Sequence, residues 1–207
     1  MSPGVRPGHA GIFILGLIAG VLLLVGLRLA GQPPLRNVHY HANWAVFVHG
    51  ARLDLRGDRY MEDVAACTAD PTQQRPEDRV HMHEGIQDIV HVHDAGATWG
   101  HLLDNLGMGL GEDILETDEG VYTSGTEGTL KFVLNGRSVR SIENQPVGDE
   151  DRLLISFGSE SPEEVLASQF PHVAETAGMY NTMPDPASCS GAIEESFGDR
   201  LRRAVWY

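Results

Sequence analysis

Three familiar catalytic signatures are missing from this sequence of 207 residues. It contains no His-Glu-x-x-His zinc motif, no Gly-x-Ser-x-Gly nucleophile elbow and no phosphate-binding loop. The sequence therefore supplies no ready-made active site, and its function has to be inferred from other patterns.

Basic residues are scarce. The chain has 15 Lys and Arg against 29 Asp and Glu, which gives a formal net charge of −14. Because phosphate contacts need a basic surface, this balance argues against nucleic acid as a partner. An acidic chain suits cations, or a protein partner that is basic.

Cysteine is nearly absent. Cys67 and Cys189 are the two in the chain, and they do not form a Cys-x-x-Cys motif. In an oxidising compartment they most simply form one disulfide, which would stabilise the fold by about 4–5 kcal/mol on the chain-entropy model. The alternative is that one of them is a copper or zinc ligand.

One long hydrophobic run is present. Residues 11–27 carry no charge, and the apolar character continues to Ala30, close to the ~20 residues that span a bilayer. A cleaved signal peptide would need small residues before its cleavage site, where Arg28 stands instead. No cysteine directly follows the hydrophobic run, which excludes a bacterial lipoprotein anchor. We therefore predict an uncleaved signal anchor at 11–30 that contacts membrane lipid, with the following domain outside the cytoplasm.

The rest of the chain is organised around hairpin and helix signals. We predict an N-terminal tail (1–10), a linker (31–37), an exported α+β domain (38–180) and an irregular C-terminal tail (181–207). The elements expected are a strand at 38–48 that turns at His49-Gly50, a short helix at 58–66, a helix capped by Thr98, a hairpin at Asn135-Gly136, a strand at 152–157 and a helix capped by Ser161. Six glycines at 107–128 indicate a loop.

This order of elements predicts a mixed β-sheet with hairpins and a few short helices. From the helix at Trp99 to Phe157, the order is similar to that of β-grasp domains. His101 lies off the apolar stripe of its helix, so we expect it to be a surface or capping residue rather than a ligand.

Three His-x-His pairs are the most unusual feature. They are His39/His41, His81/His83 and His91/His93. With 10 histidines in the chain, chance predicts about 0.5 such pairs. In a strand, side chains at i and i+2 share one face, so each pair projects two imidazoles in the same direction. The residues that alternate with the last two pairs, Val80, Met82, Val90 and Val92, then face the core.

A reversal of the chain near Gln87 would bring two of these pairs together. Pairing His81 with His93 and His83 with His91 puts cross-strand Cβ atoms about 4.5–5.5 Å apart. The candidate metal ligands are His39, His41, His81, His83, His91 and His93. We expect the carboxylates of Glu84, Asp88 and Asp94 to orient the imidazole N–H groups without binding the metal themselves.

Neutral imidazole suits zinc or copper, and clustered histidines are typical of such sites. The first function that this predicts is a membrane-anchored copper or zinc chaperone, buffer or sensor. The alternatives are an accessory subunit of a larger membrane complex, a zinc metalloenzyme with Glu84 as general base, and a metal-free structural or pH-sensing cluster.

Several segments also resemble a family of proteins. HYHANWAVFVHG, RVHMHEGIQDIVHVHDAGATWGHLLDNLG, LLISFG and DPASCSG are similar to an uncharacterised family of single-pass, membrane-anchored bacterial proteins with His-x-His motifs. The resemblance covers most of residues 38–191. It implies export and an anchor, and it implies no activity.

Overall fold

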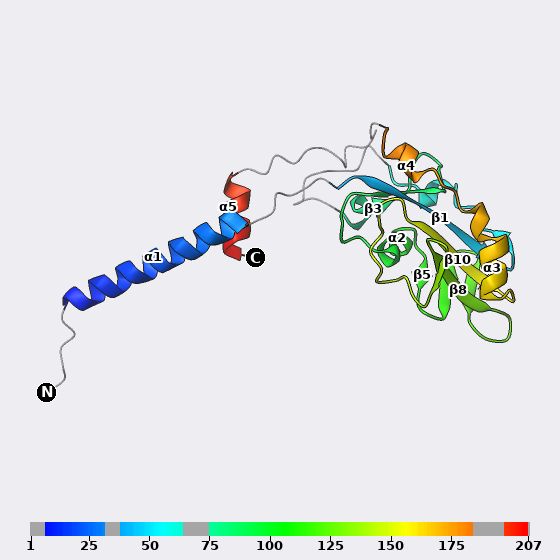
Figure 1. Cartoon of the computed structure of the whole chain (residues 1–207), viewed down its shortest axis with the longest axis horizontal. Helices are drawn as coiled ribbons and strands as arrows, with labels where there is room; N and C mark the ends of the chain where they lie inside the picture. Colours follow the sequence, from blue (N-terminus) through cyan, green and yellow to red (C-terminus); the bar gives the residue numbers. More distant parts are fainter. Residues whose placement is uncertain (1–6, 32–37, 64–74, 184–196, 207) are drawn as a thin grey trace. The chain divides into compact units, whose positions relative to one another are not determined.

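The computed structural model describes residues 7–31, 38–63, 75–183 and 197–206, and they form two units (Figure 1). One unit contains α1 (Pro7–Gly31) and α5 (Phe197–Trp206). The other contains the sheet and the remaining helices. Cys67 and Cys189, the predicted disulfide partners, lie outside the described residues, as does the predicted linker after Gly31.

Helix α1 includes one stretch, Gly11–Gly31, that is long and apolar enough to cross a membrane. A helix satisfies its backbone hydrogen bonds internally, which is what a segment in hydrocarbon requires. The predicted apolar helix is therefore confirmed. At the other end of the chain the structure has α5, where the sequence analysis expected an irregular tail.

The large unit is built on a seven-stranded mixed sheet in the order β3-β4-β1-β10-β8-β9, with the short β2 paired to β1. Strands β1 and β10 are parallel, and the other pairs are antiparallel. The predicted α+β class with a mixed sheet is confirmed. The strands are β1 (Tyr40–Val48), β2 (Ala51–Arg52), β3 (Val80–His81), β4 (Ile89–Val92), β8 (Thr129–Leu134), β9 (Arg137–Val139) and β10 (Arg152–Gly158).

Short helices lie between these strands or follow the last of them. They are α2 (Trp99–Asn105), α3 (Pro162–Ser168), α4 (Ala177–Tyr180) and the 3-10 turns η1 (Asp58–Tyr60), η2 (Pro76–Asp78) and η3 (Phe170–His172). Thr98 and Ser161 cap α2 and α3 as predicted. Of the helix expected at 58–66, residues 58–63 are described and contain only the single turn η1, because the Glu62 N–H bonds to the Met82 carbonyl instead of continuing a helix. Residues 64–66 lie outside the described part of the chain.

A second sheet occupies the segment predicted as a glycine-rich loop. It consists of β5 (Gly109–Leu110), β6 (Ile114–Thr117) and β7 (Gly120–Thr123). Leu115 is buried between the exposed Ile114 and Glu116, which anchors β6 to the core. A Cβ on Gly109 would lie 3.2 Å from the Glu116 Cβ, so this glycine permits the close approach of β5 and β6. The loop prediction was wrong because glycine also serves close strand contact.

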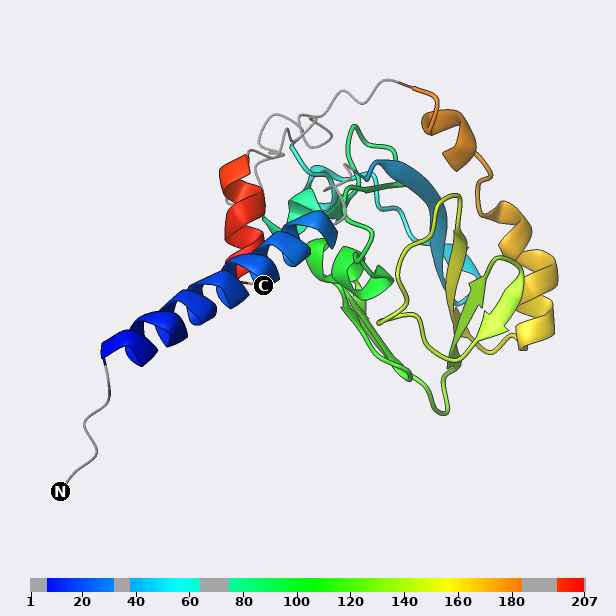
Figure 2. The ribbon, with the colours of Figure 1, turned by 60° about the vertical axis from the view of Figure 1, so that its left-hand side comes forward.

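Alternation along the strands divides the core between the two faces of the sheet. The predicted core residues Val80, Met82, Val90 and Val92 are confirmed, and they pack with α2 and with Ala42, Trp44, Val46 and Val48 of β1. The opposite face carries a smaller core that includes Phe47, Leu154 and Val165 of α3. Figure 2 shows α2 and α3 on opposite sides of the sheet. The histidines lie on the face of Phe47, at the β3-β4-β1 end.

Candidate metal centre

Strand order brings the three His-x-His pairs together. Strand β4 lies between β3 and β1, and His91 on β4 is opposite His41 on β1 and His81 on β3. Because i and i+2 share a face, His39, His83 and His93 extend this row on the same side of the sheet. The structure therefore places all six predicted residues in one region.

The predicted pairing register between the His81/His83 segment and the His91/His93 segment was wrong by two residues. His81 pairs with His91 rather than with His93. The reason lies in the turn, where Glu84 and Gly85 both have positive φ (58° and 72°) and the Ile86 N–H bonds to the His83 carbonyl. This turn ends β3 at His81 and leaves seven residues between β3 and β4. A shift of two preserves the face on which each side chain lies, so the histidines still converge.

His91 is at the centre of the histidine cluster, the name used below for His39, His41, His81, His83, His91 and His93. The centroid of its ring lies 3.7 Å from that of His83, 4.4 Å from that of His41 and 5.8 Å from that of His81. His93 completes the cluster, with its ring 5.0 Å from that of His39. Five of the six residues are at most 9% exposed, and His39 is half-buried.

Ring nitrogens of several histidines lie close to one another within the cluster. His91 Nδ1 lies 3.0 Å from His41 Nε2 and 3.1 Å from His83 Nε2. Nitrogens bound tetrahedrally at 2.0–2.1 Å would be about 3.3–3.4 Å apart. His39, His91 and His93 each offer a nitrogen within 4.8 Å of the others. These three residues could hold one metal ion once their ligand nitrogens draw together to that spacing.

Two hydrogen bonds orient the rings, and neither was foreseen from the sequence. Asn181 Oδ1 accepts from the backbone N–H of His41 at 2.9 Å and lies 2.8 Å from His41 Nδ1. The Glu77 carbonyl oxygen lies 2.6 Å from His81 Nδ1. An oxygen acceptor fixes the proton on Nδ1 and leaves the Nε2 lone pair available as a ligand. No pattern in the sequence connects Asn181 to a histidine 140 residues earlier.

The carboxylates behave differently from the prediction. Asp88 accepts from Arg52, and Asp94 accepts from Arg79 and from the Gly96 N–H. Glu84 is the one of the three that lies beside a ring, with its Oε2 3.5 Å from His83 Nδ1. Asp88 and Asp94 therefore stabilise the loops around the cluster, while an amide and a carbonyl orient two of the imidazoles.

Burial keeps the centre of the cluster neutral. Desolvation, followed by the charges that the neighbouring His83 and His41 would carry, lowers the pKa of His91 far below its usual 6.5. A neutral imidazole is the form that binds a metal ion. Its Nε2 is buried and has no hydrogen-bond partner among the described residues. A buried polar atom left in this way is costly without a ligand, and a metal ion would satisfy it.

Helix α4 is fixed above β1 by a buried asparagine. Asn43 Oδ1 accepts from the N–H groups of Thr176 and Ala177, both at 2.9 Å, and Asn43 Nδ2 donates to the Asp88 carbonyl. Asn181 follows the end of α4 directly. The Asn43 contacts therefore hold the residue that orients His41.

Replacing Asn43 with leucine should lower the free energy of unfolding by about 2–3 kcal/mol, because it leaves buried backbone N–H groups unpaired. Urea denaturation followed by circular dichroism measures this. Asn144→Leu is the control, because Asn144 is exposed in a turn and does not have positive φ. Equal losses in the two variants would contradict a special role for Asn43.

Two of the four histidines outside the cluster, His49 and His101, have defined contacts of their own. His101 Nδ1 accepts from the Thr98 N–H at 3.0 Å, so it belongs to the cap of α2, and the prediction that it is a capping residue is confirmed. His49 is at the far end of β1, where its ring packs 5.3 Å from that of Phe157. Neither contributes to the metal centre.

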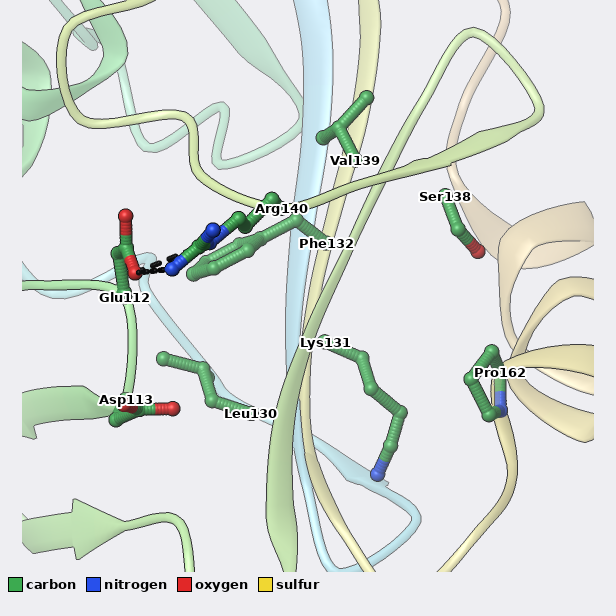
Figure 3. Close-up of a pocket in the computed structure, with 9 residues that line it drawn as sticks. All are labelled: Glu112, Asp113, Leu130, Lys131, Phe132, Ser138, Val139, Arg140 and Pro162. Carbon is green, nitrogen blue, oxygen red and sulfur yellow. Dashed lines mark hydrogen bonds and ion pairs between the residues drawn. The ribbon is translucent and has the colours of Figure 1, made fainter.

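A separate pocket opens at the β8-β9 edge of the sheet (Figure 3). Arg140 at one end is paired with Glu112, and Lys131 donates to the carbonyls of Thr129 and Gly158. Burial lowers the pKa of Lys131. Three of the four charged groups that line this pocket, Glu112, Lys131 and Arg140, thus bind other groups of the protein, and the histidine cluster remains the better candidate site.

Comparison of the chain with protein-family models, with curated proteins and with solved structures finds no match.

Proposed function

We propose that this protein is a membrane-anchored, extracytoplasmic binding protein for a transition-metal ion, copper or zinc. The observation that carries the proposal is the convergence of six imidazoles from β1, β3, β4 and their flanking residues around His91. The apolar stretch Gly11–Gly31 supports the anchor.

The burial of the cluster favours binding over catalysis. A catalytic metal needs an open position for water or substrate, whereas a storage or transfer site can be closed. His41, His81, His83 and His91 are each 2–3% exposed, and an amide or a carbonyl holds two of them in place. A chaperone, buffer or sensor therefore fits the geometry better than a metalloenzyme with Glu84 as its base.

The donor set narrows the identity of the ion. Imidazole nitrogen binds zinc and copper well, while calcium and magnesium require oxygen ligands. Four nitrogens would suit tetrahedral zinc or tetragonal copper(II). The cluster contains more imidazoles than either ion needs, so the same residues can accommodate both geometries.

The full-length protein in detergent should bind zinc or copper(II) stoichiometrically. A free-ion concentration of 100 times the dissociation constant raises the free energy of unfolding by about 2.7 kcal/mol. This corresponds to a rise in Tm of about 5–10 °C. His91→Ala should abolish both effects, because His91 is the neighbour shared by the other ligands. Metal analysis after gel filtration and differential scanning calorimetry provide the two readouts.

His172→Ala is the matched control, since this exposed histidine lies on η3, outside the cluster. It should retain full metal content and the full shift in Tm. Unchanged metal content in His91→Ala would show that the cluster does not contain the ligands. Absence of bound metal in the unmodified protein would exclude the proposed function.

A further inference from the structure

Helix α5 lies at the end of the membrane-spanning helix. Arg28 donates from Nη1 to the Ala204 carbonyl at 3.3 Å, and Arg200 donates from Nη2 to the Leu29 carbonyl at 3.4 Å. Arg28 and Leu29 stand in the last turn of α1. In a bilayer that α1 crosses, α5 would lie at the depth of the lipid headgroups, next to the last turn of α1.

One face of α5 is apolar and exposed. Phe197, Leu201 and Val205 are spaced at i, i+4 and i+8, and they are 71%, 38% and 47% exposed. On a helix this spacing forms a single stripe. Around the helix axis, Arg200 and Arg202 lie on opposite sides of this stripe. Arg200 is about 60° from Phe197 on one side, and Arg202 is about 100° from Leu201 on the other. Such an arrangement lets the apolar stripe enter the acyl region while the guanidinium groups stay in the headgroups.

The charge of the chain is unevenly distributed. Residues 38–183 contain nine Lys and Arg against 25 Asp and Glu, whereas α5 contains three arginines, at 200, 202 and 203, against one acidic residue, Asp199. An anionic surface would repel the acidic unit and attract α5. Charge complementarity therefore selects α5, and not the sheet unit, as the part that contacts anionic lipid.

We propose that α5 is an interfacial helix that binds the anionic surface of the membrane that α1 crosses. The inference rests on the anchoring in the proposed function, and it is independent of metal binding. It gives the chain a second attachment to the bilayer, beside the span itself. The recognised chemistry is the combination of anionic headgroups with the adjoining acyl chains.

Hydrogen–deuterium exchange of the full chain in lipid nanodiscs tests this proposal. In nanodiscs of phosphatidylcholine with 30% phosphatidylglycerol, about one lipid in three, the amides of α5 should exchange at least about tenfold more slowly than in phosphatidylcholine alone. High salt should remove most of that protection, since the contribution of the headgroups is screened. Leu201→Glu should remove it at low salt.

Leu166→Glu on α3 is the matched control, because Leu166 is 37% exposed and Leu201 is 38% exposed. It should leave the exchange of α5 unchanged. Protection of α5 that is independent of lipid charge, or unaffected by Leu201→Glu, would overturn the proposal. The amides of α1 report on anchoring separately: a protected α1 with an unprotected α5 refutes this inference alone, and an unprotected α1 refutes the anchor as well.

Discussion

Replacing Trp44 with alanine is expected to lower the free energy of unfolding by about 3–5 kcal/mol. Trp44 is fully buried near the middle of β1 and belongs to the main core of the sheet unit. Its Nε1 donates to the Met82 sulfur at 3.2 Å. The substitution removes the indole, its packing contacts and this hydrogen bond, and the surrounding strands cannot close the resulting cavity.

The effect should extend to the metal centre, because Met82 stands between His81 and His83. While these two rings face the cluster, the Met82 side chain faces the core and packs against Trp44. Without the indole, Met82 loses its packing partner, and the segment that carries His81 and His83 is held less firmly. Trp44→Ala should therefore weaken metal binding as well as the fold, even though Trp44 points away from the histidines.

Urea denaturation followed by circular dichroism measures the stability of the variant, and metal analysis measures its binding. Trp44→Phe is the control, because it keeps most of the buried apolar surface and should cost less than half as much. A loss below about 1 kcal/mol in Trp44→Ala would contradict the placement of Trp44 in the core.

Reduction of the predicted Cys67–Cys189 disulfide should lower the free energy of unfolding by about 4–5 kcal/mol, because the bond closes a long loop and restricts the unfolded chain. Denaturation with and without reductant measures the difference. The double variant Cys67→Ser, Cys189→Ser should have the stability of the reduced protein and should not respond to reductant.

Thiol labelling provides a direct check of the same bond. Protein that is unfolded without reductant should accept no label at Cys67 or Cys189. Two labelled thiols would exclude the disulfide, and they would leave open the alternative that one cysteine binds copper or zinc.

Local patterns in the sequence were sufficient for many elements of the fold. Asn135-Gly136 and His49-Gly50 predicted hairpin turns, and these four residues have positive φ as such turns require. Thr98 and Ser161 predicted helix starts because their side chains can accept a backbone N–H three residues later. These interactions join neighbours in the chain, so they can be read without knowledge of the fold.

The period of a strand is visible in the sequence, and it was enough to predict that each His-x-His pair projects to one face and that Val80, Met82, Val90 and Val92 face the core. Tertiary structure alone decided that β4 lies between β3 and β1, which joins His39 and His41 to the other four residues. It also decided that Asn181, rather than Asp88 or Asp94, orients His41. Strand order and these contacts depend on the packing of residues far apart in the chain, and no local pattern encodes them.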